Sequence, residues 1–149
     1  KFHFFIQPFK HLPYALVPFI LSMFVIVISL TKQGVTTELA NFFGTEQSIL
    51  VYGVSSFLSA NMINNIPMSI LYSSIIANNG ASNLGMIYGT IVGSNLGAFL
   101  TPIGALAGIM FTGLVKKQEI KYTFLDFIKY GAIISIPLLF VALGMLYLI

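Results

Sequence analysis

Polar side chains, prolines and glycines interrupt two of the most apolar stretches of the chain. The first interruption is ANMINNIPMS (60–69) and the second is GSNLGAFLTPIG (93–104). Amides, hydroxyls and backbone N–H groups hold a small ligand through hydrogen bonds and dipoles, without a formal charge. The candidate substrate-binding residues are Asn64, Asn65, Pro67, Gly93, Ser94, Asn95, Thr101, Pro102 and Gly104.

The same region lacks the side chains that most enzymes need. Asp, Glu, Lys, Arg and His are all absent between Gln47 and Val115, and the chain has no Cys. Disulfides, thiolate metal sites and cysteine nucleophiles are therefore excluded, and we expect no metal and no cofactor. An enzyme is the least expected class, because isolated hydroxyls have no acid or base beside them. A carboxylate that couples transport to protons would have to lie elsewhere.

The composition is that of an integral membrane protein. Of 149 residues, 57% are hydrophobic and only 7% are charged, and the mean hydropathy is +0.94. A soluble domain carries roughly 25% charged residues, so this chain cannot cover a soluble surface. It begins at Lys1 without a signal-peptide cleavage pattern, and we therefore expect it to be a piece of something longer. The net charge of +3 bears on membrane topology and gives no reason to expect nucleic acid as a partner.

Apolar runs and their interruptions predict an all-α, polytopic membrane fold. A helix needs about 20 apolar residues to cross a bilayer, and each half of the interrupted second run is shorter than that. The linker is mixed in character and is expected to form a short interfacial helix, with Phe42 and Phe43 facing lipid headgroups. The predicted segments are a span at 12–31, an interfacial linker at 32–47, a re-entrant hairpin at 48–77, a broken helix at 84–113, a cytoplasmic loop at 114–123 and a last span at 124–148.

Lysines provide a test of the topology. The N-terminal flank holds Lys1 and Lys10 and no acid, the region 116–129 holds four lysines and two acids, and the linker holds one lysine and two acids. Cytoplasmic loops are enriched in Lys and Arg. If 48–77 crossed the membrane once, the two basic regions would lie on opposite sides. If it dips in and returns, both are cytoplasmic and the C-terminus is outside, so the charges favour the hairpin.

Each interruption is also expected to begin a half-helix inside the membrane. Asn64 or Asn65 can cap one helix with Pro67 in its first turn, and Thr101 followed by Pro102 has the residue types of an N-cap and first position. Free N–H groups at such ends carry a positive partial charge. Two discontinuous helices of this kind are typical of the substrate site of a secondary transporter.

Several of these residues also have a purely structural interpretation. Asn and Ser in membrane helices often bond neighbouring helices together, which is an equal alternative for any single Asn here. Glycines at 93, 97 and 104 allow the chain to unwind and another backbone or a ligand to approach, and the spacing of Gly104 and Gly108 favours close helix packing. Asp126 and Lys129 are spaced to pair on one helix face.

The wording and order of SSFLSANMINNIPMSIL and GSNLGAFLTPIGALAGIMF, followed by a basic loop and a last span, resemble a known family. The resemblance is to the C-terminal part of arsenical pump membrane proteins, over 48–149. These are arsenite efflux permeases of the ion transporter superfamily, which also contains citrate and dicarboxylate carriers. The chain has Ala98-Phe99 where the family often has Pro-Lys, and Asn95 where some members have Asp.

This resemblance implies two inverted repeats, of which the chain would be the C-terminal one. MINNIP would be the tip of the second hairpin and 93–104 the unwound part of the second broken helix. The implied activity is extrusion of arsenite or antimonite across the plasma membrane by alternating access, driven by the membrane potential, a proton gradient or an ATPase subunit. Implied partners are the lipid bilayer, the N-terminal half, and an ATPase subunit or a second copy in a homodimer. A citrate, dicarboxylate or other anion carrier and a purely structural membrane subunit are the alternatives.

Overall fold

The structure is a computed structural model. Every element of secondary structure in the residues that it describes is a helix. Those residues are 14, 16–46, 48–80 and 83–148, so the predicted all-α class is confirmed. The helices in chain order are α2 (Leu16–Lys32), α3 (Val35–Phe43), α4 (Ser48–Ile63), α5 (Asn65–Asn78), α6 (Leu84–Gly97), α7 (Leu106–Lys117) and α8 (Phe124–Leu148).

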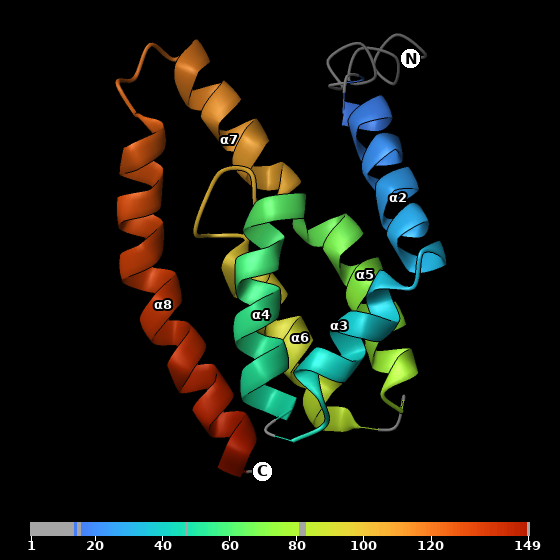
Figure 1. Cartoon of the computed structure of the whole chain (residues 1–149). Coiled ribbons are helices and arrows are strands. Elements are labelled where there is room, and N and C mark those ends of the chain that lie inside the picture. Colours follow the sequence, from blue (N-terminus) through green and yellow to red (C-terminus); the bar gives the residue numbers. More distant parts are fainter. Residues whose placement is uncertain (1–13, 15, 47, 81–82, 149) are drawn as a thin grey trace, which may run out of the picture.

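The α4–α6 pair forms the centre of the molecule and has its most extensive helix–helix contact. The α8 helix packs against this pair, whereas α2 and α3 pack against α5. Figure 1 shows α4 and α5 as a hairpin that opens at the end of the molecule where α8 finishes. The start of α2 and the turn between α7 and α8 lie at the opposite end.

Only α8 is by itself long and apolar enough to cross a membrane, among the helices in the described ranges. The segment from Val17 to Phe43 meets the same criterion as a pair, bent by 74° at a break that includes Gly34. Gly34 has φ +81°, a conformation that a side chain would strain. Of the predicted span at 12–31, residues 12, 13 and 15 lie outside the described residues.

The α8 helix begins with a reciprocal capping box. Thr123 donates from its backbone N–H (2.8 Å) and its hydroxyl (2.7 Å) to Asp126 Oδ2, and the Asp126 N–H donates back to the Thr123 hydroxyl (3.2 Å). These bonds satisfy N–H groups that a helix start leaves open. Asp126 therefore caps the helix, whereas its spacing had suggested a pair with Lys129. The Lys129 amine lies 6.0 Å from the centre of the Tyr130 ring.

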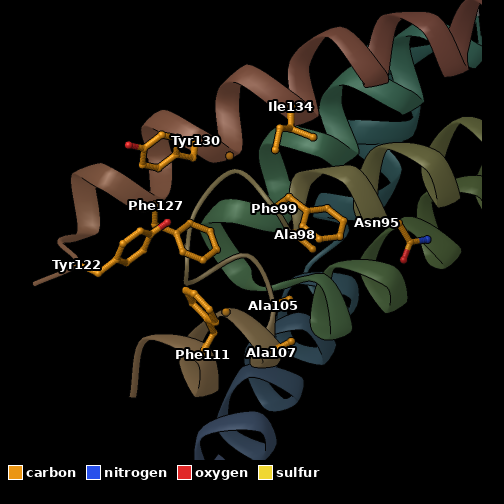
Figure 2. A pocket seen from close by; sticks show the side chains of 12 residues that line it. Asn95, Ala98, Phe99, Ala105, Ala107, Phe111, Tyr122, Phe127, Tyr130 and Ile134 are labelled. Atoms are coloured by element: carbon orange, nitrogen blue, oxygen red, sulfur yellow. The ribbon is translucent and has the colours of Figure 1, made fainter. Parts of the chain in front are cut away.

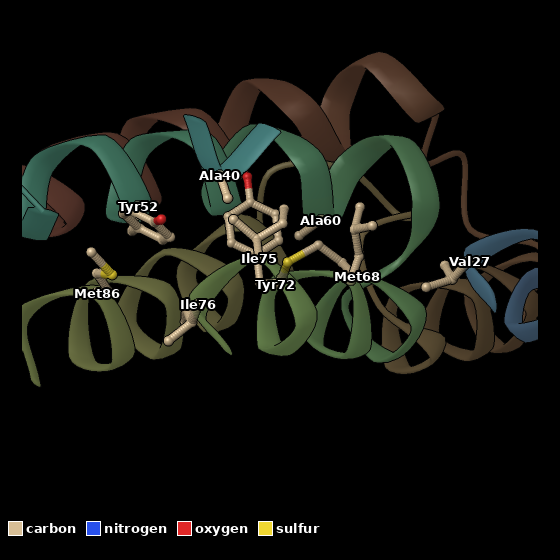
Figure 3. Close-up of a cluster of buried hydrophobic side chains, with 10 residues drawn as sticks. Val27, Ala40, Tyr52, Ala60, Met68, Tyr72, Ile75, Ile76 and Met86 are labelled. Carbon is tan, nitrogen blue, oxygen red and sulfur yellow. The ribbon is translucent and has the colours of Figure 1, made fainter. Parts of the chain in front are cut away.

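The main hydrophobic core lies where the hairpin meets α2 and α3 (Figure 3). Tyr52, Met68 and Ile75 are fully buried there. The Phe43 ring packs into this core, 5.5 Å from the ring centre of Tyr52, so the prediction that it faces headgroups is wrong. Phe42 is 84% exposed. Neighbouring helical residues point about 100° apart, which explains why one ring turns inward and the other outward.

Small residues on α6 bring it unusually close to α4. A Cβ added to Gly89 would lie 2.6 Å from the Ile49 carbonyl oxygen, and one added to Gly93 or Gly97 would collide with the carbonyl of Gly53 or Phe57. Both Gly93 and Gly97 lie within α6. The expectation that they let the chain unwind is therefore wrong, because both lie in an intact helix. The expectation that they let another backbone approach is confirmed, because their missing side chains allow contact with the backbone of α4.

Candidate functional site: the hairpin tip and the broken helix

Asn64 forms the tip of the hairpin, between the end of α4 and the start of α5. Its backbone has φ 68° and ψ 149°, a region that is essentially reserved for glycine. Its side chain is buried and holds the turn from both sides. The Oδ1 atom accepts from the Ile66 N–H (3.3 Å), and Nδ2 donates to the Ile103 carbonyl (3.0 Å). Asn64 is thus the residue that caps α5, with Pro67 in the first turn.

The segment 98–105 connects α6 to α7 without helical structure, and the hairpin tip is bonded directly to it. Besides the bond from Asn64, the Asn65 N–H donates to the Gly104 carbonyl (3.0 Å). The Thr101 hydroxyl donates to Asn61 Oδ1 (2.8 Å), and Asn61 Nδ2 donates to the Phe57 carbonyl (2.8 Å). The two interruptions of the sequence, some forty residues apart, therefore form one hydrogen-bonded unit.

The second half-helix begins later than the sequence predicts. The α7 helix starts at Leu106 with Ala105 as its N-cap and no side-chain cap, so Thr101 and Pro102 are not its N-cap and first position. The Thr101 hydroxyl is committed to Asn61, and its carbonyl accepts from the Gly104 N–H (3.1 Å) in a turn. A Cβ at Gly108 would lie 2.6 Å from the Pro102 carbonyl oxygen. The small residue at this position therefore packs against the connecting segment and not against another helix.

The two half-helix starts differ in what they offer a ligand. At the start of α5 the N–H groups of Asn65, Ile66 and Met68 all have acceptors and Pro67 has none to donate. The expectation of free N–H groups at this end is therefore wrong. At the start of α7 the N–H groups of 105–107 have no acceptor among the described residues. Only this second helix end therefore presents open donors and an uncompensated positive partial charge.

A cavity of about 490 Å³ lies against this open helix end, between 98–108 and α8. Figure 2 shows the aromatic side chains of Phe111, Tyr122 and Phe127 at one end of it and Asn95 at the other. The Asn95 side chain is exposed, and its Nδ2 donates to the Ile91 carbonyl (2.8 Å), which leaves Oδ1 open. The cavity thus joins an apolar, aromatic wall to a few polar groups, as small-molecule sites commonly do.

The other predicted site residues have different surroundings. Ser94 lines a different cavity from Asn95, because adjacent helical residues point about 100° apart. The Asn65 side chain is half-buried and has no hydrogen-bond partner among the described residues. A Cβ at Gly104 would lie 2.9 Å from Asn61 Oδ1. Four of the predicted site residues are buried and have no polar side chain to offer a ligand: Pro67, Gly93, Pro102 and Gly104.

Sequence reasoning noted Asn61 as one of three asparagines in the first interruption but did not include it, or the aromatic end of the cavity, among the site residues. Asn61 lies in the same polar run as the hairpin tip, and that signal was sufficient to find it. The three rings come together only because α7 and α8 fold back on each other, with the Phe111 and Tyr122 ring centres 5.8 Å apart. In the part of the chain that the structure describes, no group of His, Cys, Asp or Glu is suited to hold a metal ion.

Apolar helices interrupted by two polar breaks that bond to each other are consistent with a polytopic membrane protein. The chain belongs to the arsenical pump membrane protein family, because the model of that family matches residues 5–149. The resemblance stated from the sequence is thereby confirmed.

Individual relatives support the same assignment. The chain is 27% identical over 145 residues to an arsenical pump membrane protein of Escherichia coli, a match that covers 91% of this chain and 34% of that protein. It is 28% identical to the protein of that name from Yersinia enterocolitica, with the same coverage. An uncharacterized transporter of Mycobacterium tuberculosis is 29% identical over 87% of this chain and 33% of its own length. The chain thus spans about a third of the relatives it matches, and no solved structure matches it.

Proposed function

We propose that this chain is the C-terminal part of a membrane carrier that extrudes arsenite or antimonite by alternating access. The observation that carries the proposal is the joined hairpin tip and connecting segment, with the open N–H groups of α7 beside them. A substrate bound there touches two broken helices at once. Small movements of either helix then open or close the site, as alternating access requires.

The chemistry of the groups suits an uncharged, hydroxyl-rich substrate. Arsenite at neutral pH is mostly a neutral trihydroxide, which amides and backbone N–H groups hold without a counter-charge. The available groups are the Asn65 amide, Asn95 Oδ1 and the N–H groups of 105–107. The absence of Cys also favours release, since thiolates bind soft metals and metalloids tightly.

The N-terminal half of the parent protein is the expected partner at this site. In a fold of two inverted repeats, the substrate lies near the bilayer midplane where the repeats meet. We place the N-terminal flank and 114–123 on the cytoplasmic side of the plasma membrane and the C-terminus outside. The basic turn between α7 and α8 lies at one end of the molecule in Figure 1 and the hairpin opens at the other, and positive-inside reasoning supports this orientation. The N-terminal flank lies outside the described residues. An ATPase subunit or a second copy remains a further proposed partner.

Arsenite uptake by everted vesicles that contain the full-length parent tests the site. Asn65→Ala removes an amide that has no partner among the described residues, so uptake should fall by roughly 3- to 10-fold, the value of one hydrogen bond. Asn41→Ala is the matched control, because Asn41 is an exposed amide on α3. Unchanged uptake by the Asn65 variant would remove this residue from the site, and absence of arsenite uptake by the parent would overturn the proposed function.

The open start of α7 also favours a second candidate, a carrier for citrate or another organic anion. A helix N-terminus with free N–H groups stabilises negative charge. Competition separates the two candidates in the same vesicles. Citrate that blocks or replaces arsenite uptake favours the anion carrier, whereas uptake that citrate leaves unchanged favours arsenite.

A further inference from the structure

A second cavity lies between α5 and α6 and differs in chemistry from the one beside α7. Its volume is about 360 Å³, and Ser94 lines it whereas Asn95 lines the larger cavity. Four of its lining residues carry hydroxyls, spaced four apart on each helix so that they share a face. These residues are Ser69, Ser73, Thr90 and Ser94.

The order of these residues gives the groove a direction. The α5 helix runs away from the hairpin tip and α6 runs back toward it (Figure 1). Ser69, one turn from the tip, and Ser94, near the end of α6, therefore form the end of the groove nearest the tip. Ala77 and Ile87 form the far end, near the base of the hairpin. Hydroxyls thus line the half of the groove that approaches the candidate substrate site.

Thr90 is the unusual member of this set. It is 8% exposed, and its hydroxyl has no hydrogen-bond partner in the structure. Burying a hydroxyl without a partner costs free energy. A water or a solute in the groove that Thr90 lines would remove that cost.

The hydroxyls also indicate what kind of solute fits. Ser69 and Ser94 donate to the carbonyls of Ile66 (2.7 Å) and Ile91 (3.1 Å), so only their oxygen lone pairs remain available. Ser73 and Thr90 have no partner among the described residues and can donate or accept. The groove therefore offers two hydroxyls that only accept hydrogen bonds, two that can donate or accept, and no charged side chain. A neutral solute with several hydroxyls can bond to all four, because each of its hydroxyls both donates and accepts. An anion would need more donors.

We propose that this groove is a hydrated binding path for a small uncharged polyhydroxyl solute, leading from the base of the hairpin to its tip. The inference rests on the proposed function of the hairpin tip and adds a route and a solute class to it. As the solute moves, it exchanges hydrogen bonds with the hydroxyls of α5 and with those of α6 that face them. No charged side chain lines the groove, so no strong ion pair slows its release.

Cysteine accessibility tests hydration of the groove. Single variants Ser73→Cys and Ser94→Cys are made in the full-length parent, with any cysteine outside this chain replaced, and are treated with a membrane-impermeant methanethiosulfonate reagent. Ile70→Cys and Tyr88→Cys are the controls on the same helices, because neither residue lines the groove and both are exposed, as Ser73 is, whereas Ser94 is only half-buried. Groove cysteines should react at least about tenfold faster, because an apolar environment raises a thiol pKa and each unit removes tenfold of the thiolate. Equal rates would overturn the proposal.

Protection and a hydroxyl deletion test the solute class. Boric acid, an uncharged trihydroxide that does not react with thiols, should slow labelling at Ser73→Cys and Ser94→Cys, and citrate should not. Fast labelling without this protection also overturns the proposal. Thr90→Val should lower arsenite uptake without lowering thermal stability, since it deletes an unpartnered hydroxyl. Unchanged uptake contradicts the role of Thr90 as part of the path. The labelling experiments do not require transport, so a parent that fails to transport arsenite overturns the proposed function separately.

Discussion

At the scale of the residue, Asn64 combines backbone strain with two side-chain hydrogen bonds. Its conformation costs on the order of 1–3 kcal/mol for a residue other than glycine. Its bonds to Ile66 and Ile103 satisfy the start of α5 and join the tip to the connecting segment. Strain that persists because surrounding contacts impose it is common at functional sites. Asn64 has such a position, because it joins the tip of the α4–α5 hairpin to the segment between α6 and α7.

Substitutions at Asn64 should separate the two contributions. Asn64→Ala keeps the strain and loses both bonds, and we expect the parent protein to lose about 2 kcal/mol of stability. Asn64→Gly loses the same bonds but relieves the strain, so its stability should lie close to that of the original protein. Thermal unfolding in detergent, followed by helical circular dichroism, measures both. Equal destabilisation by Ala and Gly would show that the backbone at this position is not strained.

At the scale of the element, the contact between α4 and α6 decides where both halves of the site lie. The hairpin tip is at the end of α4, and the connecting segment follows directly from α6. Close packing at Gly89, Gly93 and Gly97 therefore sets the distance between the two interruptions. Any side chain added there pushes one half of the site away from the other.

Gly93→Ala should show this dependence. Its Cβ would collide with the Gly53 carbonyl, and overpacking of this kind costs about 1–3 kcal/mol. Gly144→Ala on α8 is the control, because nothing lies within 4 Å of its added Cβ. The control should be neutral or stabilising by about 0.5–1 kcal/mol, the helix preference of Ala over Gly. Equal stabilities of the two variants in the same unfolding assay would contradict the close α4–α6 contact.

At the scale of the whole molecule, the ends of the elements separate into two groups. The start of α2 and the turn from α7 to α8 lie at the same end of the molecule, on opposite sides of it, and the base of the hairpin and the end of α8 lie at the other end (Figure 1). Four of the five lysines among the described residues lie within 116–129, around the turn from α7 to α8. We propose that this end faces the cytoplasm, because cytoplasmic loops are enriched in Lys and Arg.

Cysteines placed at the two ends should report this orientation. An impermeant thiol reagent added to intact cells should label Thr45→Cys in the parent, because Thr45 is an exposed residue between α3 and α4. Gln118→Cys, in the turn between α7 and α8, should react only after the cells are permeabilised. Labelling of Gln118→Cys in intact cells would reverse the proposed orientation.

The sequence by itself determined the class of the protein and the location of its polar breaks. A composition with 7% charged residues requires lipid around it, and Asn64 with Pro67 marks a helix start through local capping chemistry alone. Such signals depend on neighbours within one turn and are therefore readable from the sequence.

Only the tertiary structure decided what each polar group binds. Thr101 and Pro102 have the local signature of a helix start, yet Thr101 bonds to Asn61 and α7 begins at Leu106. Gly93 has the local signature of a flexible point, yet it lies within α6 against the α4 backbone. Thr101 and Gly93 each contact a residue about forty positions earlier in the chain. The residues next to them in the sequence give no sign of such a distant partner. That partner is fixed by the packing of α4 against α6, which brings the two interruptions together.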